Sequence, residues 1–144
     1  MRSSSATIAV FTLALTVAAA VAIAGGPSGS VWKGVYTSAQ SARGKAQYDA
    51  HCAECHGSAL NGSDNIPELA GGTFLANWDG LSAADLFTRI RTTMPANNPG
   101  SLSDGAAVDV MAYLFQVNQF PAGKAELAAD SEALKQIGIS RGAP

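Results

Sequence analysis

The sequence predicts a small all-α domain with long loops wrapped around a bound group. Three segments have the composition or spacing of helices, at residues 38–51, 83–91 and 104–117. Between the first two lies a run dense in Gly, Asn, Asp and Pro, residues 57–80, which predicts a long loop. A structureless loop of that length is unusual in so small a domain and normally surrounds something. We therefore expect three core helices and a cofactor enclosed by loops.

The first 24 residues differ in character from the rest and are expected to form a signal peptide. Met1 and Arg2 form a short basic start, residues 6–24 carry no charge, and Ala22 and Ala24 supply the small residues of a cleavage site. The apolar run also approaches the length of a membrane span, roughly 17 to 25 residues, so an uncleaved anchor is the alternative. We expect a secreted, periplasmic protein, or else a membrane-anchored protein that faces the periplasm.

The remaining chain is expected to hold one domain. We divide it into a flexible linker at residues 25–34, a domain at residues 35–122 and a C-terminal tail at residues 123–144. Because Arg2 is the only basic residue of the leader, the rest carries 8 Lys or Arg against 11 Asp or Glu, a net charge of −3. This weak and evenly spread charge excludes a nucleic-acid partner. Membrane contact is expected only if the leader is uncleaved.

Each predicted helix has its own local signal. Residues 38–51 are rich in helix formers. Ser82 and Asp85 approximate a capping box for residues 83–91, where apolar residues fall on one face. Ser103 precedes residues 104–117, which hold the most continuous apolar stripe of the chain. A short helix is also expected near residues 131–136.

The segment CAECH, Cys52 to His56, matches the attachment site of a c-type haem. Two thiols separated by two residues can reach the two vinyl groups of one porphyrin and form thioethers. The histidine that follows is then placed beneath the ring, where its imidazole can coordinate the iron. The motif thus predicts one covalently attached haem c bound through Cys52, Cys55 and His56.

Three other interpretations of the two cysteines fit the sequence less well. A disulfide is the default in an oxidising compartment, but the spacing of the pair argues against it. A redox dithiol normally follows a strand, and no strand pattern precedes Cys52. A zinc site needs four ligands, whereas here Cys52, Cys55, His56 and His51 are crowded within six residues and no second pair follows.

The motif, with GKAQY before it, the pair Met94–Pro95 and the segment VDVMAYL after it, resembles the class I cytochrome c family over about residues 35–120. The resemblance implies the cytochrome c fold, three core helices packed around a haem. In that fold the first and last helices cross near a small residue and aromatic side chains. The residues that fit this crossing are Gly44, Tyr48, Tyr113 and Leu114.

The resemblance also implies the remaining contacts of the haem. Met94 and Met111 are the only methionines after the leader. Met111 lies inside an amphipathic helix and is expected to fill the core. Met94 lies beside Pro95, where the family has its axial methionine. In the family a prolyl carbonyl accepts the second ring N–H of the histidine, and the candidate is Pro67, 11 residues after His56.

Contacts to the haem propionates are less defined by the sequence. Trp78, Arg89 and Arg91 carry N–H donors suited to carboxylates, although arginines at helical spacing are more often solvated.

The expected function is electron transport by a monohaem cytochrome with His/Met ligation, not enzymatic catalysis. The alternative is a haem peroxidase or a ligand-sensing protein with an open sixth site. The residues from Val35 to Ile139 are similar to small cytochromes that accept electrons from periplasmic quinoprotein (PQQ) dehydrogenases. A shuttle to a terminal oxidase is the other possible role. We expect a monomer or a weakly bound subunit.

Overall fold

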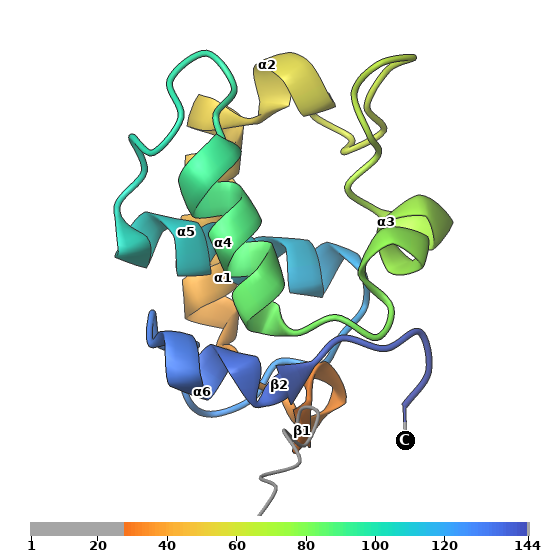
Figure 1. Ribbon diagram of the computed structural model, residues 1–144, viewed down its shortest axis with the longest axis vertical. Helices are drawn as coiled ribbons and strands as arrows, with labels where there is room; N and C mark the ends of the chain where they lie inside the picture. The colour runs from red at the N-terminus through yellow and green to blue at the C-terminus, as the bar shows by residue number, and fades with distance from the viewer. Residues whose placement is uncertain (1–27, 144) are drawn as a thin grey trace, which may run out of the picture.

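The computed structural model describes residues 28–143 and confirms the predicted all-α architecture (Figure 1). Within this range a single two-stranded parallel sheet joins the two ends of the chain. In chain order the elements are β1 (Gly29–Ser30), the 3₁₀ helix η1 (Val31–Lys33), α1 (Ser38–His51), α2 (Ala53–His56), α3 (Gly71–Trp78), α4 (Ala83–Thr93), α5 (Asp104–Val117), α6 (Ser131–Lys135) and β2 (Ile137–Gly138).

The three predicted core helices are present, with the caps that their sequences encode. The side chains of Thr37 and Ser103 accept backbone N–H groups at the starts of α1 and α5. Ser82 and Asp85 form a complete capping box at the start of α4. Hydrogen bonds from Ser82 lower the pKa of the Asp85 carboxyl. Helix α4 runs two residues past the predicted end at Arg91 and stops at Met94.

Helices α1 and α5 cross with their backbones in close contact at Gly44. A β-carbon on Gly44 would lie 1.7 Å from the carbonyl oxygen of Asp109 and 3.0 Å from the β-carbon of Tyr113. Beside this contact the rings of Tyr48 and Tyr113 pack with centroids 5.4 Å apart. Only glycine therefore permits this crossing, and Gly44, Tyr48 and Tyr113, three of the residues predicted to form it, lie together.

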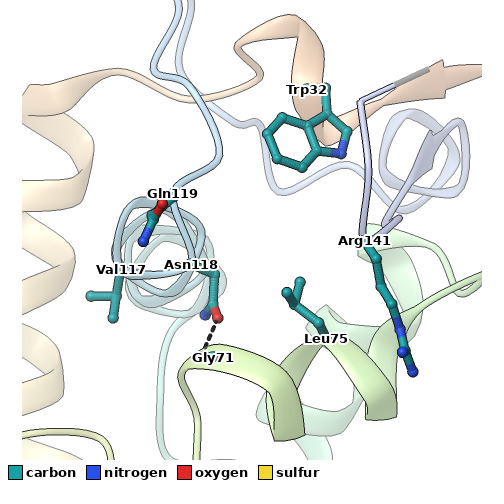
Figure 2. A pocket seen from close by; sticks show the side chains of 7 residues that line it. All are labelled: Trp32, Gly71, Leu75, Val117, Asn118, Gln119 and Arg141. Carbon is teal, nitrogen blue, oxygen red and sulfur yellow. Dashed lines mark hydrogen bonds between the residues drawn. The ribbon is translucent and has the colours of Figure 1, made fainter.

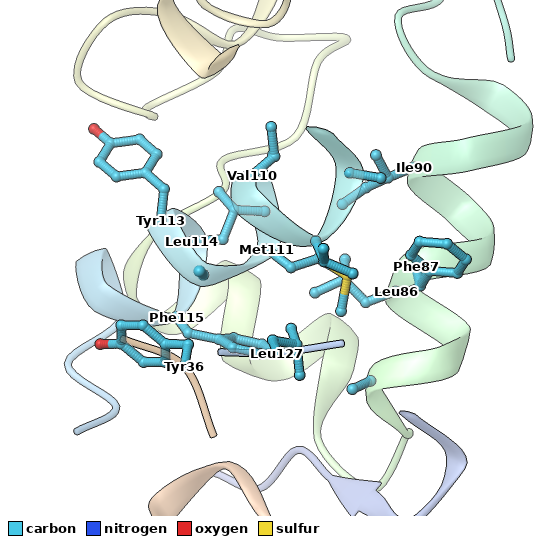
Figure 3. Close-up of a cluster of buried hydrophobic side chains, with 14 of the residues drawn as sticks. Tyr36, Leu86, Phe87, Ile90, Val110, Met111, Tyr113, Leu114, Phe115 and Leu127 are labelled. Carbon is cyan, nitrogen blue, oxygen red and sulfur yellow. The ribbon is translucent and has the colours of Figure 1, made fainter. Parts of the chain in front are cut away.

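The core lies between α5 and the helices on either side of it (Figure 3). Met111 is fully buried and points toward Leu86 and Phe87 of α4. Phe115 packs against Tyr36 and Phe120 with ring centroids 6.3 Å and 5.7 Å away. Met111 thus fills the core, as expected for a methionine in the middle of an amphipathic helix.

The loop predicted over residues 57–80 is interrupted by α3, which sequence patterns did not predict. The helix has only eight residues, starts with two glycines and lacks a side-chain cap on its first residues. Its side chain Phe74 is fully buried, with the ring of Trp78 6.3 Å away. Burial of Phe74 in the tertiary structure, and not local helix propensity, stabilises this helix.

The segments that flank the core are folded onto it, in contrast to the expected flexible linker and tail. Val31 of η1 and Leu134 of α6 are fully buried, and β1 pairs with β2. The indole Nε1 of Trp32 donates to the carbonyl oxygen of Ser140 at 3.0 Å. The packed unit therefore extends beyond residues 35–122 at both ends, because apolar side chains in both segments are buried.

The predicted signal peptide, residues 1–24, lies outside the described residues. Among the helices within residues 28–143, none combines the length and apolar character needed to cross a bilayer.

The crossing at Gly44 can be tested by adding one methyl group. Gly44→Ala should lower the free energy of unfolding by about 1 to 3 kcal/mol or more, because the backbones must separate to admit the new β-carbon. The matched control is Gly105→Ala in α5, since a β-carbon there meets nothing within 4 Å. That variant should be unchanged or more stable by up to about 1 kcal/mol. Denaturant unfolding of both holoproteins measures the difference, and equal effects would contradict the steric explanation.

Candidate functional site

The CAECH segment forms a tight turn at the end of α1. The N–H of Cys52 donates to the carbonyl oxygen of Tyr48 at 2.8 Å, so Cys52 ends α1 and begins α2. The N–H of His56 then donates to the carbonyl oxygen of Cys52 at 2.9 Å. Gly57, with φ of 77°, ends the turn. The Tyr48 hydroxyl donates to the Gly57 carbonyl at 2.7 Å and fixes the turn to α1.

Both cysteines lie on this turn and form no disulfide. Cys52 is half-buried and Cys55 is exposed. Burial, with a smaller effect of Cys55, raises the pKa of the Cys52 thiol to about 11. A redox dithiol works through a thiolate with a lowered pKa, so this environment does not favour that interpretation. It is compatible with thiols that are consumed in thioether bonds.

His56 is the buried member of the motif, with 7% of its surface exposed. Its Nδ1 lies 3.0 Å from the carbonyl oxygen of Pro67. Because a carbonyl oxygen can only accept, Nδ1 must carry the proton, and the Nε2 lone pair is then available to a metal. The structure thus brings together His56 and Pro67, the pair that the sequence analysis linked.

The chain between His56 and Pro67 returns through a compact loop. The N–H of Gly62, at φ of 57°, donates to the carbonyl oxygen of His56 at 2.9 Å. Leu60 is 3% exposed, and its carbonyl oxygen accepts the N–H of Leu69 at 2.8 Å. These contacts hold the Pro67 carbonyl against the imidazole ring.

Met94 lies at the end of α4, where its N–H donates to the Ile90 carbonyl oxygen at 3.1 Å. Its side chain is half-buried, whereas Met111 is fully buried in the core. The loop that follows Met94 lies at the same end of the molecule as α2 (Figure 1). Met94 therefore remains the predicted sixth ligand, and Met111 does not compete with it.

The candidate propionate donors have different environments. The guanidinium of Arg91 binds the segment that joins α4 to α5. Its Nε lies 2.5 Å from Oδ1 of Asp104, and its Nη1 donates to the carbonyl oxygens of Gly100 and Leu102. Arg91 thus fixes the loop after Met94, a role that the sequence did not indicate. Arg89 is exposed and Trp78 is half-buried.

The zinc interpretation has no support in the described part of the chain. Within residues 28–143 no group of three or more His, Cys, Asp or Glu side chains is arranged to hold a metal ion. His51, the extra histidine of the motif region, is exposed at the end of α1. A covalently attached haem requires two thiols that can form thioethers with its vinyl groups and one imidazole that can coordinate its iron. Cys52, Cys55 and His56 lie on a single turn and fit that cofactor.

Residues 39–114 match the protein family described as "Cytochrome C oxidase, cbb3-type, subunit III". The chain belongs to this family of cytochrome c domains. It is accordingly a class I-like c-type cytochrome with covalently bound haem c, and an electron carrier. The prediction of the family and of its cofactor is confirmed.

A likeness of fold also links the chain to a solved structure, the sulfane dehydrogenase SoxCD from Paracoccus pantotrophus. The TM-score is 0.51 and the sequence identity is 24%, over 67% of this chain. The match covers 51% of the other chain, so this cytochrome spans about half of that protein's length. No curated protein matches the chain.

One buried polar residue near the site was missed by the sequence analysis. Asn118 is 7% exposed and contacts the segment that follows Pro67. Asn118 directly follows Val117, the last residue of α5, so its sequence position predicts only a helix cap. That position does not indicate the long-range contact.

Proposed function

We propose that this cytochrome is a single-electron carrier whose haem iron is bound by His56 and Met94. The observation that carries the proposal is the buried imidazole of His56, with Nδ1 3.0 Å from the Pro67 carbonyl oxygen and with Cys52 and Cys55, which form no disulfide, on the turn before it. A metal-ligating histidine characteristically donates its other ring N–H to such an acceptor. The hydrogen bond orients the ring and makes Nε2 the ligand atom.

Met94 is the proposed second axial ligand. A thioether sulfur is a soft and neutral donor that favours the reduced iron. We therefore expect a fairly high reduction potential. The haem would supply one-electron redox chemistry, and His56 and Met94 would hold its iron in both oxidation states. If both residues are bound to the iron, no ligand position is left for a substrate, which disfavours a peroxidase or a ligand sensor.

Substitution of each methionine tests the ligation. Met94→Ala should remove the weak far-red sulfur-to-iron charge-transfer band of the oxidised protein and lower the reduction potential. It should also let the reduced protein bind carbon monoxide at neutral pH. The matched control is Met111→Leu, which keeps the volume of a fully buried core residue and should cost less than about 1.5 kcal/mol. Optical spectra and potentiometric titration measure these changes.

Two outcomes would contradict His/Met ligation. One is a Met94→Ala protein that keeps the charge-transfer band. The other is an unmodified reduced protein that binds carbon monoxide readily, which would favour the open-site alternative.

We further propose that the protein works in the periplasm after removal of residues 1–24. The uncharged segment of residues 6–24 and the small residues Ala22 and Ala24 support this proposal. In the class I cytochrome c family the thioether bonds form outside the cytoplasm, so export must precede haem attachment. The mature chain would begin at or near Gly25, and a chain that keeps the leader would be anchored in the membrane.

The proposed electron donor is a periplasmic quinoprotein dehydrogenase that oxidises alcohols or sugars. The loop at residues 94–101 has no charged residue, and the CAECH turn has only Glu54. A surface with so few charges cannot steer a partner from a distance. We expect a small and transient contact, below about 1,200 Å², as in other redox encounters. The family's description as an oxidase subunit makes a terminal oxidase the alternative partner.

The dependence of electron transfer on salt tests this partner. Between 0.01 and 0.1 M ionic strength the Debye length falls from about 30 Å to about 10 Å. The rate of reduction by the dehydrogenase should change only mildly over this range. Stopped-flow absorbance of the haem measures the rate directly.

A fall in that rate of about ten-fold or more would indicate strong electrostatic steering and contradict the neutral contact. A complex that survives gel filtration would instead make the protein a fixed subunit. Failure of the dehydrogenase to reduce the cytochrome would exclude it as the donor.

A further inference from the structure

Asn118 follows the last residue of α5 and has a buried side-chain amide. Only 7% of the residue is exposed, and buried polar groups are costly unless they are hydrogen-bonded. Its Nδ2 donates to the carbonyl oxygens of Leu69 at 3.0 Å and Leu114 at 2.9 Å. Its Oδ1 accepts the N–H of Gly71 at 2.9 Å. A flipped amide would face these groups with the wrong atoms, so the contacts fix its orientation.

These hydrogen bonds connect α5 to the segment that supplies the acceptor for His56. Pro67, whose carbonyl oxygen faces Nδ1 of His56, is two residues before Leu69. The peptide groups of Leu69 are held on both sides, since its N–H donates to Leu60 and its carbonyl oxygen accepts from Asn118. The bond to Gly71 then fixes the start of α3 (Figure 2).

The two glycines at the end of this segment add no side-chain packing of their own. Gly71 is exposed, has φ of 69°, and a β-carbon there would meet nothing within 4 Å. Gly72 is also exposed, and a β-carbon there would likewise meet nothing within 4 Å. Beside Asn118 lies a cavity of about 300 Å³, lined in part by Trp32, Leu75 and Arg141 (Figure 2). Leu69 and Ala70 pack against the core and Phe74 is fully buried, and the Asn118 amide adds the hydrogen bonds that fix the Leu69 carbonyl group and the Gly71 N–H between these anchored side chains.

We propose that Asn118 is a positioning residue that holds the Pro67 carbonyl against His56 and so sets the orientation and basicity of that imidazole. The inference rests on the proposed ligation of the iron by His56. Helix α5 is fixed by its crossing with α1 and serves as the rigid support. A hydrogen bond from Nδ1 makes a histidine a stronger donor to its metal, and a stronger donor favours the oxidised iron. Removal of the Asn118 amide should therefore weaken the hydrogen bond between Nδ1 of His56 and the Pro67 carbonyl oxygen, and so raise the reduction potential of the haem.

The experiment compares Asn118→Leu with Gln40→Leu in the haem-loaded protein. Gln40 is an equivalent control, because its buried side chain also holds a peptide group by two hydrogen bonds, to Leu127 at 2.9 Å and 2.8 Å. Leu127 belongs to the C-terminal segment and not to the loop that carries Pro67. Both variants should lose stability, whereas only Asn118→Leu should affect His56.

Two readouts report on His56 without relying on activity. In Asn118→Leu the ring N–H of His56 should exchange with solvent about ten-fold faster in NMR spectra of the reduced protein, the effect of losing about 1.4 kcal/mol of hydrogen bonding. The potential should rise in a spectroelectrochemical titration. Gln40→Leu should leave both at the wild-type values. Equal behaviour of the two variants, or no change in Asn118→Leu, would overturn the inference.

If Asn118→Leu does not accumulate, Asn118→Ala takes its place, and the unmodified protein gives a third test. The side-chain amide protons of Asn118 and the N–H of Gly71 should be protected from exchange together with the ring N–H of His56. Rapid exchange at Asn118 and Gly71 beside a protected His56 ring would overturn the inference. A His56 ring without haem-shifted resonances would instead refute the ligation on which it rests.

Discussion

Helices α1 and α5 touch through their backbones at Gly44, where a β-carbon would lie 1.7 Å from the Asp109 carbonyl oxygen. The arrangement of the haem-binding residues depends on this contact. The C-terminal end of α1 leads directly into the CAECH turn, and the C-terminal end of α5 carries Asn118. The crossing fixes the two helices relative to each other. It therefore also fixes the CAECH turn and Asn118, which hold the two ends of the loop at residues 57–71.

Hydrogen bonds to backbone groups then fix the imidazole of His56 relative to these two helices. The Tyr48 hydroxyl holds the Gly57 carbonyl, the Pro67 carbonyl holds Nδ1 of His56, and Asn118 holds Leu69 and Gly71. Near Met94, hydrogen bonds have a similar role, because Arg91 binds Asp104 and the carbonyl groups of the loop that follows Met94. An electron carrier needs ligands that stay in place in both oxidation states, and these contacts provide that rigidity.

The sequence predicted what depends on local patterns. The bounds of α1 and α5 and the capping box of α4 follow from caps and apolar spacing, and the CAECH motif specified the cofactor. Helix α3 was missed because burial of Phe74 stabilises it, not propensity. The linker was expected to be flexible and the tail to lie outside the domain, because no local pattern shows that Trp32 reaches Ser140. Arg91 and Asn118 act through contacts with residues far from them in the sequence. No pattern of spacing in a single sequence indicates such contacts.

The most direct test of this account is mass spectrometry of the protein purified from the periplasmic fraction. We expect the mass of a chain that begins at or near Gly25 plus one haem, with the haem on the peptide that contains Cys52 and Cys55 and no thiol open to alkylation. A peptide with two unmodified thiols, or with a disulfide between them, would contradict covalent haem attachment and with it the proposed electron transfer.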